Sequence, residues 1–198
     1  AENQTFAGTL IVEDLDGLKN DSRNKNINDV SITISGSDFE LGALIETSNG
    51  STGIYSAPIS FKTAPDYETK STYSVIVTAS DGANSPTQSI TVNVTDVNDA
   101  PMFISSSTFS VPENQTSIGS VIATDADGDT INFSLAGTDA SLLSVNSSTG
   151  VLTFNSSPDY ETKSYYTATV TATDGTNSTD QSITVTVTDV DDVAPVFT

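Results

Sequence analysis

Residues 65–82 read PDYETKSTYSVIVTASDG, and residues 158–175 read PDYETKSYYTATVTATDG, nearly the same sequence 93 residues later (158 − 65). A second pair, QSITVNVTDVND at 88–99 and QSITVTVTDVDD at 181–192, has the same offset. Two copies of a segment this long indicate two tandem domains rather than a many-repeat solenoid.

Apolar and polar residues alternate along both copies. A period of two over this length predicts half-buried strands with one face turned inward. Thr, Val and Ile favour strands, and NG, DG, TG and SP mark turns. The predicted fold class is therefore all-β, with two Greek-key β-sandwiches of immunoglobulin-like architecture. The alternating inward residues are Tyr73, Val75, Val77, Ala79, Ile90, Val92 and Val94, and then Tyr166, Ala168, Val170, Ala172, Ile183, Val185 and Val187.

The first halves of the two copies have a different offset. ENQT at 2–5 recurs at 113–116, and DLDG at 14–17 recurs as DADG at 125–128, an offset of 111 (113 − 2 and 125 − 14). The 18 additional residues (111 − 93) belong to the first copy, most of them in an insertion.

These offsets predict domain boundaries. We expect one domain at 1–97, a second at 98–190, and a linker toward a further repeat at 191–198. The second copy has SSSTFSVP at 105–112 ahead of its ENQT, so we expect the first domain to have a shortened first strand.

An inserted loop is predicted at about residues 18–30. It is polar and rich in Asn, and it holds Lys19, Arg23 and Lys25, half of the six basic residues. We interpret it as a surface loop. The alternative is a contact with a ligand or with a preceding domain.

The composition narrows the possible chemistry. The chain has 26 acidic and 6 basic residues, a formal net charge of −20, and no Cys, His or Trp. Thiol and imidazole catalysis and the usual zinc, copper and iron ligands are therefore excluded, and nucleic acid and anionic membranes are poor partners. The remaining metal ligands are hard oxygens, which select Ca²⁺ or Mg²⁺. No apolar run is long enough to cross a bilayer.

The acidic residues recur at matching positions in the two copies. In an extended segment, Asp66 and Glu68 would point to one side and Tyr67 to the other, which suggests a two-carboxylate clamp with a core anchor; Tyr160 would have the same role. The run DADGDTINFSLA at 125–136 fails as a helix–loop–helix calcium loop, because that loop needs Gly at its sixth position and Glu at its twelfth. Any calcium ligands must therefore come from separate segments. A glycosidase would need two carboxylates facing a cleft, whereas these acids cluster at domain ends, so we predict that the chain is not an enzyme.

Five motifs in order resemble the calcium-binding motifs of cadherin repeats, and the resemblance covers essentially the whole chain twice. The motifs are PEN at 112–114, DADG at 125–128, PDYE at 158–161, ATDG at 172–175 and DVNDAP at 96–101. In that family calcium lies between consecutive domains, usually as three ions. The linker here is one residue shorter than the family pattern, so a backbone carbonyl of Ala100 would replace the usual Asn.

The resemblance implies three sets of metal ligands. The interdomain site comprises Glu2, Asp66, Glu68, Asp96, Asn98, Asp99, Ala100, Asp125, Asp127 and Asp174. A C-terminal half-site comprises Glu113, Asp159, Glu161, Asp189, Asp191 and Asp192. An N-terminal half-site comprises Asp14, Asp16 and Asp81.

The functional expectation follows from the resemblance. Ca²⁺ at the linker would rigidify an extended, extracellular cell-surface adhesion protein, whose partners would be neighbouring repeats and a homophilic or polysaccharide ligand. The composition and short linker look most like cadherin-like repeats of bacterial surface or biofilm proteins. The alternative is a module that binds a carbohydrate or protein ligand.

Overall fold

The computed structural model describes residues 1–14, 30–47 and 53–191. Two compact units are present, Ala1–Val97 (unit 1) and Asn98–Thr198 (unit 2). The inserted loop predicted at about 18–30, with its three basic residues, lies outside the described ranges apart from Val30. Asp16 and Asp192 lie outside them as well.

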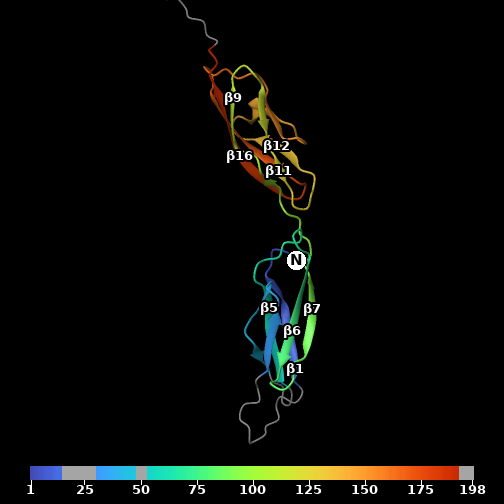
Figure 1. The fold of residues 1–198 in the computed structure, drawn as a ribbon. Helices are drawn as coiled ribbons and strands as arrows, with labels where there is room; N and C mark the ends of the chain where they lie inside the picture. The colour runs from blue at the N-terminus through green and yellow to red at the C-terminus, as the bar shows by residue number, and fades with distance from the viewer. Residues whose placement is uncertain (15–29, 48–52, 192–198) are drawn as a thin grey trace, which may run out of the picture. The chain divides into compact units, whose positions relative to one another are not determined.

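Unit 1 is built from two antiparallel sheets. One sheet has the order β1-β5-β3, with β4 also paired to β5, and the other has the order β2-β6-β7. β1, β5, β6 and β7 run along the length of the unit (Figure 1). The strands are β1 (Phe6–Asp14), β2 (Ser31–Ser35), β3 (Phe39–Leu41), β4 (Ile45–Glu46), β5 (Gly53–Phe61), β6 (Thr72–Ser80) and β7 (Thr87–Asn93).

Unit 2 contains sheets in the orders β10-β14-β13 and β12-β15-β16-β9, and the short pair β11-β8. β9 joins β16 in parallel, whereas the other pairings in the unit are antiparallel. The strands are β8 (Met102–Phe103), β9 (Thr108–Pro112), β10 (Ser117–Ser120), β11 (Ala123–Thr124), β12 (Asn132–Ala136), β13 (Leu143–Val145), β14 (Val151–Phe154), β15 (Tyr165–Thr173) and β16 (Ser178–Thr188).

The predicted all-β fold class is confirmed. In the described part of the chain the only helical element is a 3-10 turn, Ala140–Leu142, and no helix there is long and apolar enough to span a membrane. Period-two burial is clear in β15, where Tyr166, Ala168, Val170 and Ala172 are buried and the residues between them are more exposed. β15 is a central strand with neighbours on both sides, so these four side chains contribute to the core of unit 2 while its threonines alternate with them.

The two cores differ in extent. Unit 2 has one large buried cluster that includes Leu152, Val170, Ile183 and Val185. The corresponding cluster of unit 1 is smaller and centres on Phe39, Phe61 and Val75, with Tyr73 against it. Phe39 and Phe61 lie 4.6 Å apart between ring centroids.

Candidate metal centre

A buried glutamate opens each repeat. Glu2 is 2% exposed and Glu113 is 3% exposed. The carboxylate of Glu113 accepts hydrogen bonds from the backbone N–H groups of Tyr160 and Val190, both at 2.8 Å. Glu2 accepts the equivalent bonds from Tyr67 and Val97, also at 2.8 Å. Each glutamate therefore ties together the PDYE turn and the segment after the last strand of its own unit.

The asparagine after each glutamate has a backbone role. Asn3 and Asn114 have φ values of 60° and 64°, the left-handed region that Asn tolerates better than most residues. Their N–H groups donate to the carbonyls of Pro65 and Pro158 at 3.0 Å. The Glu-Asn pair thus fixes the chain at the point where the acidic groups gather.

Three carboxylates meet around Glu113. Oxygens of Glu113, Glu161 and Asp189 lie within 4.8 Å of one another. Unit 1 repeats part of this arrangement, because Glu68 has an oxygen within 4.8 Å of one from Glu2 and of one from Asp96. Like charges at this separation repel, and a cation bound among them would compensate that repulsion.

Glu161 shows this repulsion directly. A hydrogen bond from its own backbone N–H lowers its pKa, but burial and the charges of Glu113, Asp189 and Asp159 outweigh that bond and raise the pKa overall. A divalent cation among these oxygens would remove the repulsion.

The Asp-x-Glu segment is a turn, which corrects the expectation of an extended clamp. Asp159 accepts hydrogen bonds from the backbone and side chain of Thr162, which lower its pKa. Asp66 makes the same bonds to Thr69, with the same effect on its pKa. In each pair, therefore, Glu68 or Glu161 joins the carboxylate group, while the aspartate caps the turn.

The expected core role of the tyrosines in this segment is wrong. Tyr67 and Tyr160 are 37% and 39% exposed. Because the segment turns, their backbone N–H groups face the buried glutamates and their rings lie at the surface. The signal that sequence reasoning missed is the TK that follows DYE, since the threonine completes the aspartate cap.

A second group of carboxylates lies in the DADGD turn of unit 2. Oxygens of Asp125, Asp127 and Asp129 lie within 4.8 Å of one another. Oδ2 of Asp125 is buried and has no hydrogen-bond partner among the described residues. Sequence reasoning missed Asp129, although the alternating acids of DADGD were the signal for it.

The linker residues of unit 2 fold against its own acidic turns. The N–H of Asp99 donates to Oδ2 of Asp127 at 2.8 Å. The side chain of Asn98 donates to Oδ2 of Asp174 at 2.9 Å, and this bond is the largest cause of the lowered pKa of Asp174. Asn177 donates in turn to the carbonyl of Asn98. These hydrogen bonds bring together Asn98, Asp99, Asp127 and Asp174, four residues of the predicted interdomain set.

Asp81 and Asp174 both support tight turns. Oδ1 of Asp81 accepts the N–H groups of Ala83 and Asn84, and these bonds lower its pKa. Oδ1 of Asp174 accepts the N–H groups of Thr176 and Asn177. The second oxygen of each aspartate accepts a side-chain amide, from Asn84 at 3.2 Å for Asp81 and from Asn98 at 2.9 Å for Asp174.

The remaining predicted ligands lie in less crowded surroundings. Asp14 ends β1, opposite Gly53 of β5. Ala100 is exposed and could contribute only its carbonyl, and Asp191 is exposed beyond β16.

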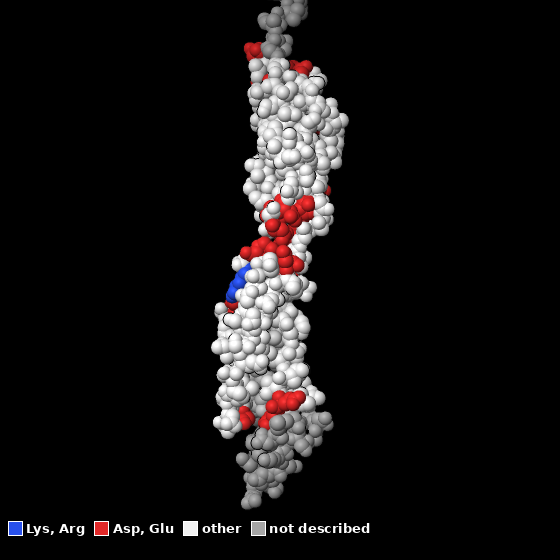
Figure 2. Space-filling view, turned by 90° about the vertical axis from the view of Figure 1, so that its right-hand side faces the viewer, with Lys and Arg blue, Asp and Glu red and all other residues white. Residues whose placement is uncertain are grey.

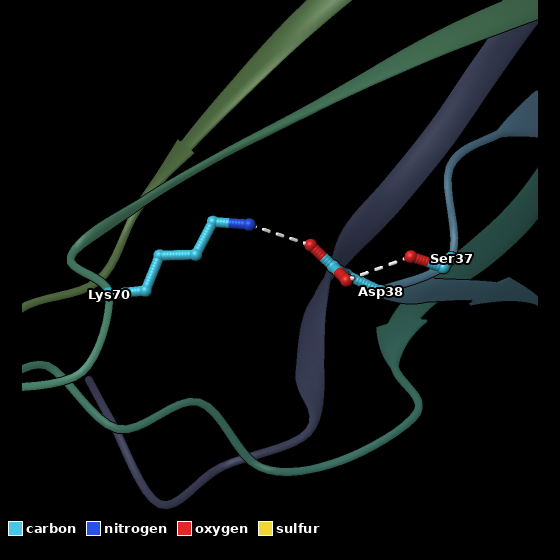
Figure 3. Close-up of polar contacts among 3 residues, drawn as sticks. All are labelled: Ser37, Asp38 and Lys70. Atoms are coloured by element: carbon cyan, nitrogen blue, oxygen red, sulfur yellow. Dashed lines mark hydrogen bonds and ion pairs between the residues drawn. The ribbon is translucent and has the colours of Figure 1, made fainter.

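Two of the described lysines pair with carboxylates outside the predicted ligand set. Lys70 donates to Asp38 at 2.8 Å, with Ser37 on the same carboxylate (Figure 3). Lys163 makes the equivalent ion pair with Asp139. On the face that Figure 2 shows, Asp and Glu gather at the ends of the units, and few charges lie along the units between those ends.

The donor set fits a hard divalent cation. The groups offer carboxylate oxygens, with amide and backbone oxygens beside them, which is the ligand chemistry of Ca²⁺ rather than of Zn²⁺ or copper. The buried oxygen of Asp125, which has no hydrogen-bond partner among the described residues, and the repulsion at Glu161 both suit a cation ligand set.

Comparisons with known proteins place these features in a family. Residues 107–188 match the family model described as Cadherin domain. The human protein Protocadherin Fat 4 is 39% identical over 135 residues, which is 63% of this chain and 3% of that protein. The structure of a protocadherin gammaB7 EC3-6 cis-dimer aligns with a TM-score of 0.54 and 28% identity over 89% of this chain and 46% of that one. The chain thus spans 3% of the curated relative and less than half of the solved structure, and together the matches support cadherin repeats.

Proposed function

We propose that this chain is a pair of calcium-binding adhesion repeats from the extracellular part of a cell-surface protein, and that Ca²⁺ bound at the ends of the units rigidifies the array. The observation that carries the proposal is the convergence of Glu113, Glu161 and Asp189. Unit 1 repeats it in part, with Glu68 close to Glu2 and also close to Asp96. Cadherin domains are calcium-dependent adhesion modules, which supports the same assignment.

The residues that would hold calcium fall into two kinds. Buried Glu2 and Glu113 have both carboxylate oxygens on backbone N–H groups, so they are held in position before a cation arrives. The exposed Glu68 and Glu161 can adjust. Bound Ca²⁺ would supply positive charge that converts the repulsion between these carboxylates into attraction.

The proposed site between the repeats would use the Glu2, Glu68 and Asp96 group of unit 1 with Asp66, and the Asp125, Asp127 and Asp174 group of unit 2 with Asn98, Asp99 and the carbonyl of Ala100. The assignment rests on each half by itself. Val97 is hydrogen-bonded to Glu2, and the next residue, Asn98, is hydrogen-bonded to Asp174. The residues on either side of the Val97–Asn98 peptide bond are therefore each hydrogen-bonded to their own unit, so a cation shared by the two groups would act close to this bond.

A modest binding free energy is enough for Ca²⁺ to stiffen the linker. An extracellular calcium module binds at about 10⁻⁴–10⁻³ M, so one site of Kd about 10⁻⁴ M adds about 1.4 kcal/mol at millimolar Ca²⁺. Several ions would add to this value. The C-terminal group of Glu113, Asp159, Glu161, Asp189, Asp191 and Asp192 and the N-terminal group of Asp14, Asp16 and Asp81 would act in the same way with neighbouring repeats.

The partners proposed are neighbouring repeats and a homophilic contact. The relatives named above are protocadherins, so a bacterial surface or biofilm source stays a prediction from composition. The comparisons give no support to a polysaccharide partner or to a carbohydrate-binding module.

Small-angle scattering tests the rigidification. We expect the full chain to have a narrower distribution of interdomain distances in millimolar Ca²⁺ than in EGTA, and we expect Asp99→Ala to remove most of that difference. Asp180→Asn, an exposed charge change away from the predicted ligands, is the matched control. Identical distributions in calcium and EGTA would refute the proposal.

A further inference from the structure

The chain contains nine Asn-x-Ser/Thr tripeptides, or sequons, the acceptor pattern for N-linked glycosylation. Two of them, at Asn20 and Asn49, lie outside the described residues. The others begin at Asn3, Asn93, Asn114, Asn132, Asn146, Asn155 and Asn177. A pattern this short also arises by chance in a chain rich in Asn, Ser and Thr, so the structure has to show which sequon suits a glycan.

The chemistry of the modification supplies a structural criterion. An asparagine side chain has one acceptor oxygen, Oδ1, and two N–H donors on Nδ2. Glycosylation replaces one of those donor hydrogens with a bulky, solvated sugar and leaves the oxygen unchanged. A sequon is therefore compatible with a glycan where the fold uses only the oxygen of its asparagine, and incompatible where the fold encloses the nitrogen.

Asn146 meets this criterion in the turn between β13 and β14. Its Oδ1 accepts the backbone N–H groups of Ser148 and Thr149, both at 3.0 Å. Its own N–H donates to the carbonyl of Val151, and its carbonyl accepts the N–H of Gly150. Every other polar group of Asn146 thus has a partner, whereas Nδ2 has none among the described residues.

The turn that holds Asn146 is open to solvent. The four consecutive residues 146–149 are all exposed, and Gly150 after them is buried. The two bonds to Oδ1 form an Asx-type turn, which holds the carboxamide with its oxygen toward the backbone and its nitrogen away from it. A sugar on Nδ2 would therefore leave the surface without displacing a hydrogen bond of the turn.

Asn155 begins the same tripeptide, Asn-Ser-Ser, and fails the criterion. Its Nδ2 donates to the backbone carbonyls of Ser141 at 2.9 Å and Leu143 at 3.3 Å. Its Oδ1 accepts the hydroxyl of Ser144 at 2.6 Å. A sugar on this nitrogen would break the bonds that join the segment after β14 to the segment that enters β13. The two sequons thus share a sequence and differ in the role of the amide.

The remaining described sequons suit a glycan less well. Asn93 and Asn132 lie in strands, and the middle residue of each tripeptide is buried in the core. Nδ2 of Asn177 donates to a backbone carbonyl. Asn3 and Asn114 directly follow the buried glutamates of the proposed metal groups.

We propose that Asn146 is an N-glycosylation site, which accepts an oligosaccharide from a lipid pyrophosphate carrier. The transfer forms a bond between Nδ2 and the anomeric carbon of the first sugar, and it breaks the bond from that carbon to the pyrophosphate. One proton leaves Nδ2, the lipid pyrophosphate is the leaving group, and nothing is oxidised or reduced. This inference rests on the extracellular location proposed above, because the transfer acts on chains that enter the secretory route.

The fold then separates the two Asn-Ser-Ser sequons. Because the tripeptide is modified on the newly made chain, both Asn146 and Asn155 meet the transferase before folding. A chain with a glycan at Asn146 can still form all the bonds of its turn. A chain with a glycan at Asn155 loses buried or half-buried backbone partners and is depleted from the folded protein.

The test uses the full 198-residue chain secreted from cultured animal cells behind a cleaved signal peptide. Enzymatic deglycosylation in heavy-oxygen water converts each glycosylated Asn to labelled Asp, and peptide mass spectrometry then gives the occupancy of each sequon. We expect Asn146 to be occupied in most of the folded monomer and Asn155 at least about tenfold less. Ser148→Ala removes the sequon but keeps the backbone N–H that caps Asn146, so it should abolish this glycan and leave the melting temperature of unit 2 unchanged.

A matched pair of variants tests the amide roles without any glycan, in protein made in bacteria. Asn146→Asp keeps both acceptor bonds and should lower the melting temperature of unit 2 by less than about 2 °C. Asn155→Asp removes both donor bonds and should lower it by at least about 4–8 °C.

Three results would overturn the inference. They are an unoccupied Asn146 in the secreted protein, equal occupancy of Asn155 in the folded monomer, or equal melting of the two Asp variants. Each readout is taken in Ca²⁺ and in EGTA, and the expected differences are the same in both. Failure of the glycan inference would therefore leave the calcium proposal standing, and a chain that binds no Ca²⁺ would still be expected to carry the glycan at Asn146.

Discussion

Glu113→Gln tests the buried glutamate most sharply. The amide of Gln has one acceptor oxygen, so it can satisfy only one of the two backbone N–H groups, of Tyr160 and Val190, that now donate to the carboxylate at 2.8 Å. The other N–H is left facing an NH₂ group in a site only 3% exposed. A buried donor without a partner costs about 1.5–3 kcal/mol where the lost bond was to a charged group.

The expected result is a loss of stability that is confined to unit 2. For a domain of this size, each kcal/mol shifts Tm by about 4–8 °C, so unit 2 should melt about 6–24 °C lower. In EGTA the loss should be at the lower end, because the substitution also relieves repulsion with Glu161 and Asp189. In millimolar Ca²⁺ the difference in the melting temperature of unit 2 between the wild type and Glu113→Gln should be larger than in EGTA, since the variant has lost one anionic ligand.

Native-state hydrogen exchange measures this loss for unit 2 alone, through the core amides of Val170 and Val185, with calorimetry on the same samples. Asp180→Asn removes the same charge from an exposed position of β16 and should change stability by no more than about 0.5 kcal/mol. The reasoning is refuted if Glu113→Gln is as stable as the control in EGTA and gains as much stability from calcium as the wild type.

Three further predictions concern the framework around the sites. Asp139→Ala should destabilise unit 2 by about 2–3 kcal/mol in urea unfolding, since it leaves Lys163 and the N–H of Thr167 without their buried partner. Asp38→Ala, which removes the exposed ion pair with Lys70, should destabilise unit 1 by clearly less, and equal losses would contradict this ranking. Hydrogen bonding to Lys163, then to Thr167, holds the pKa of Asp139 below its ordinary value of 3.8. The contribution of this carboxylate to the free energy of unfolding is therefore fully present above pH 3.8 and is lost as the pH falls through the lower pKa of the folded state. Acid unfolding of Asp139→Asn should lack this part of the transition. Gly150→Ala should lower the free energy of unfolding by about 3 kcal/mol or more, because a Cβ would lie 2.2 Å from the carbonyl oxygen of Val121 at a φ of +68°. Gly128→Ala has a φ of +78° but open space around the Cβ, so it should cost only about 1–2 kcal/mol when both variants are compared in thermal melts.

Much of the fold could be predicted because the signal is local and repeated. Alternation in β15 and β16 defines the inward face directly, and the internal repeat shows which residues have equivalent roles. Glu2 and Glu113 were placed among the acidic groups for the same reason.

The errors came from backbone conformation. Whether Asp66-Tyr67-Glu68 is extended or turned depends on the hydrogen bonds from Thr69 to Asp66, and periodicity does not report them. The exposed rings of Tyr67 and Tyr160 follow from that turn. Asp129 was missed because only the first two acids of DADGD fit the family motif, whereas the turn brings all three together.

The central claim is that the carboxylate groups hold Ca²⁺. Isothermal titration of the metal-free full chain with CaCl₂, beside a Glu161→Gln/Asp189→Asn variant, tests it most directly. We predict binding in the range of about 10⁻⁴–10⁻³ M, with fewer sites in the variant, because the group around Glu113 has lost two of its three charges. A wild-type chain that binds no Ca²⁺ at about 10 mM, well above that range, would contradict the account.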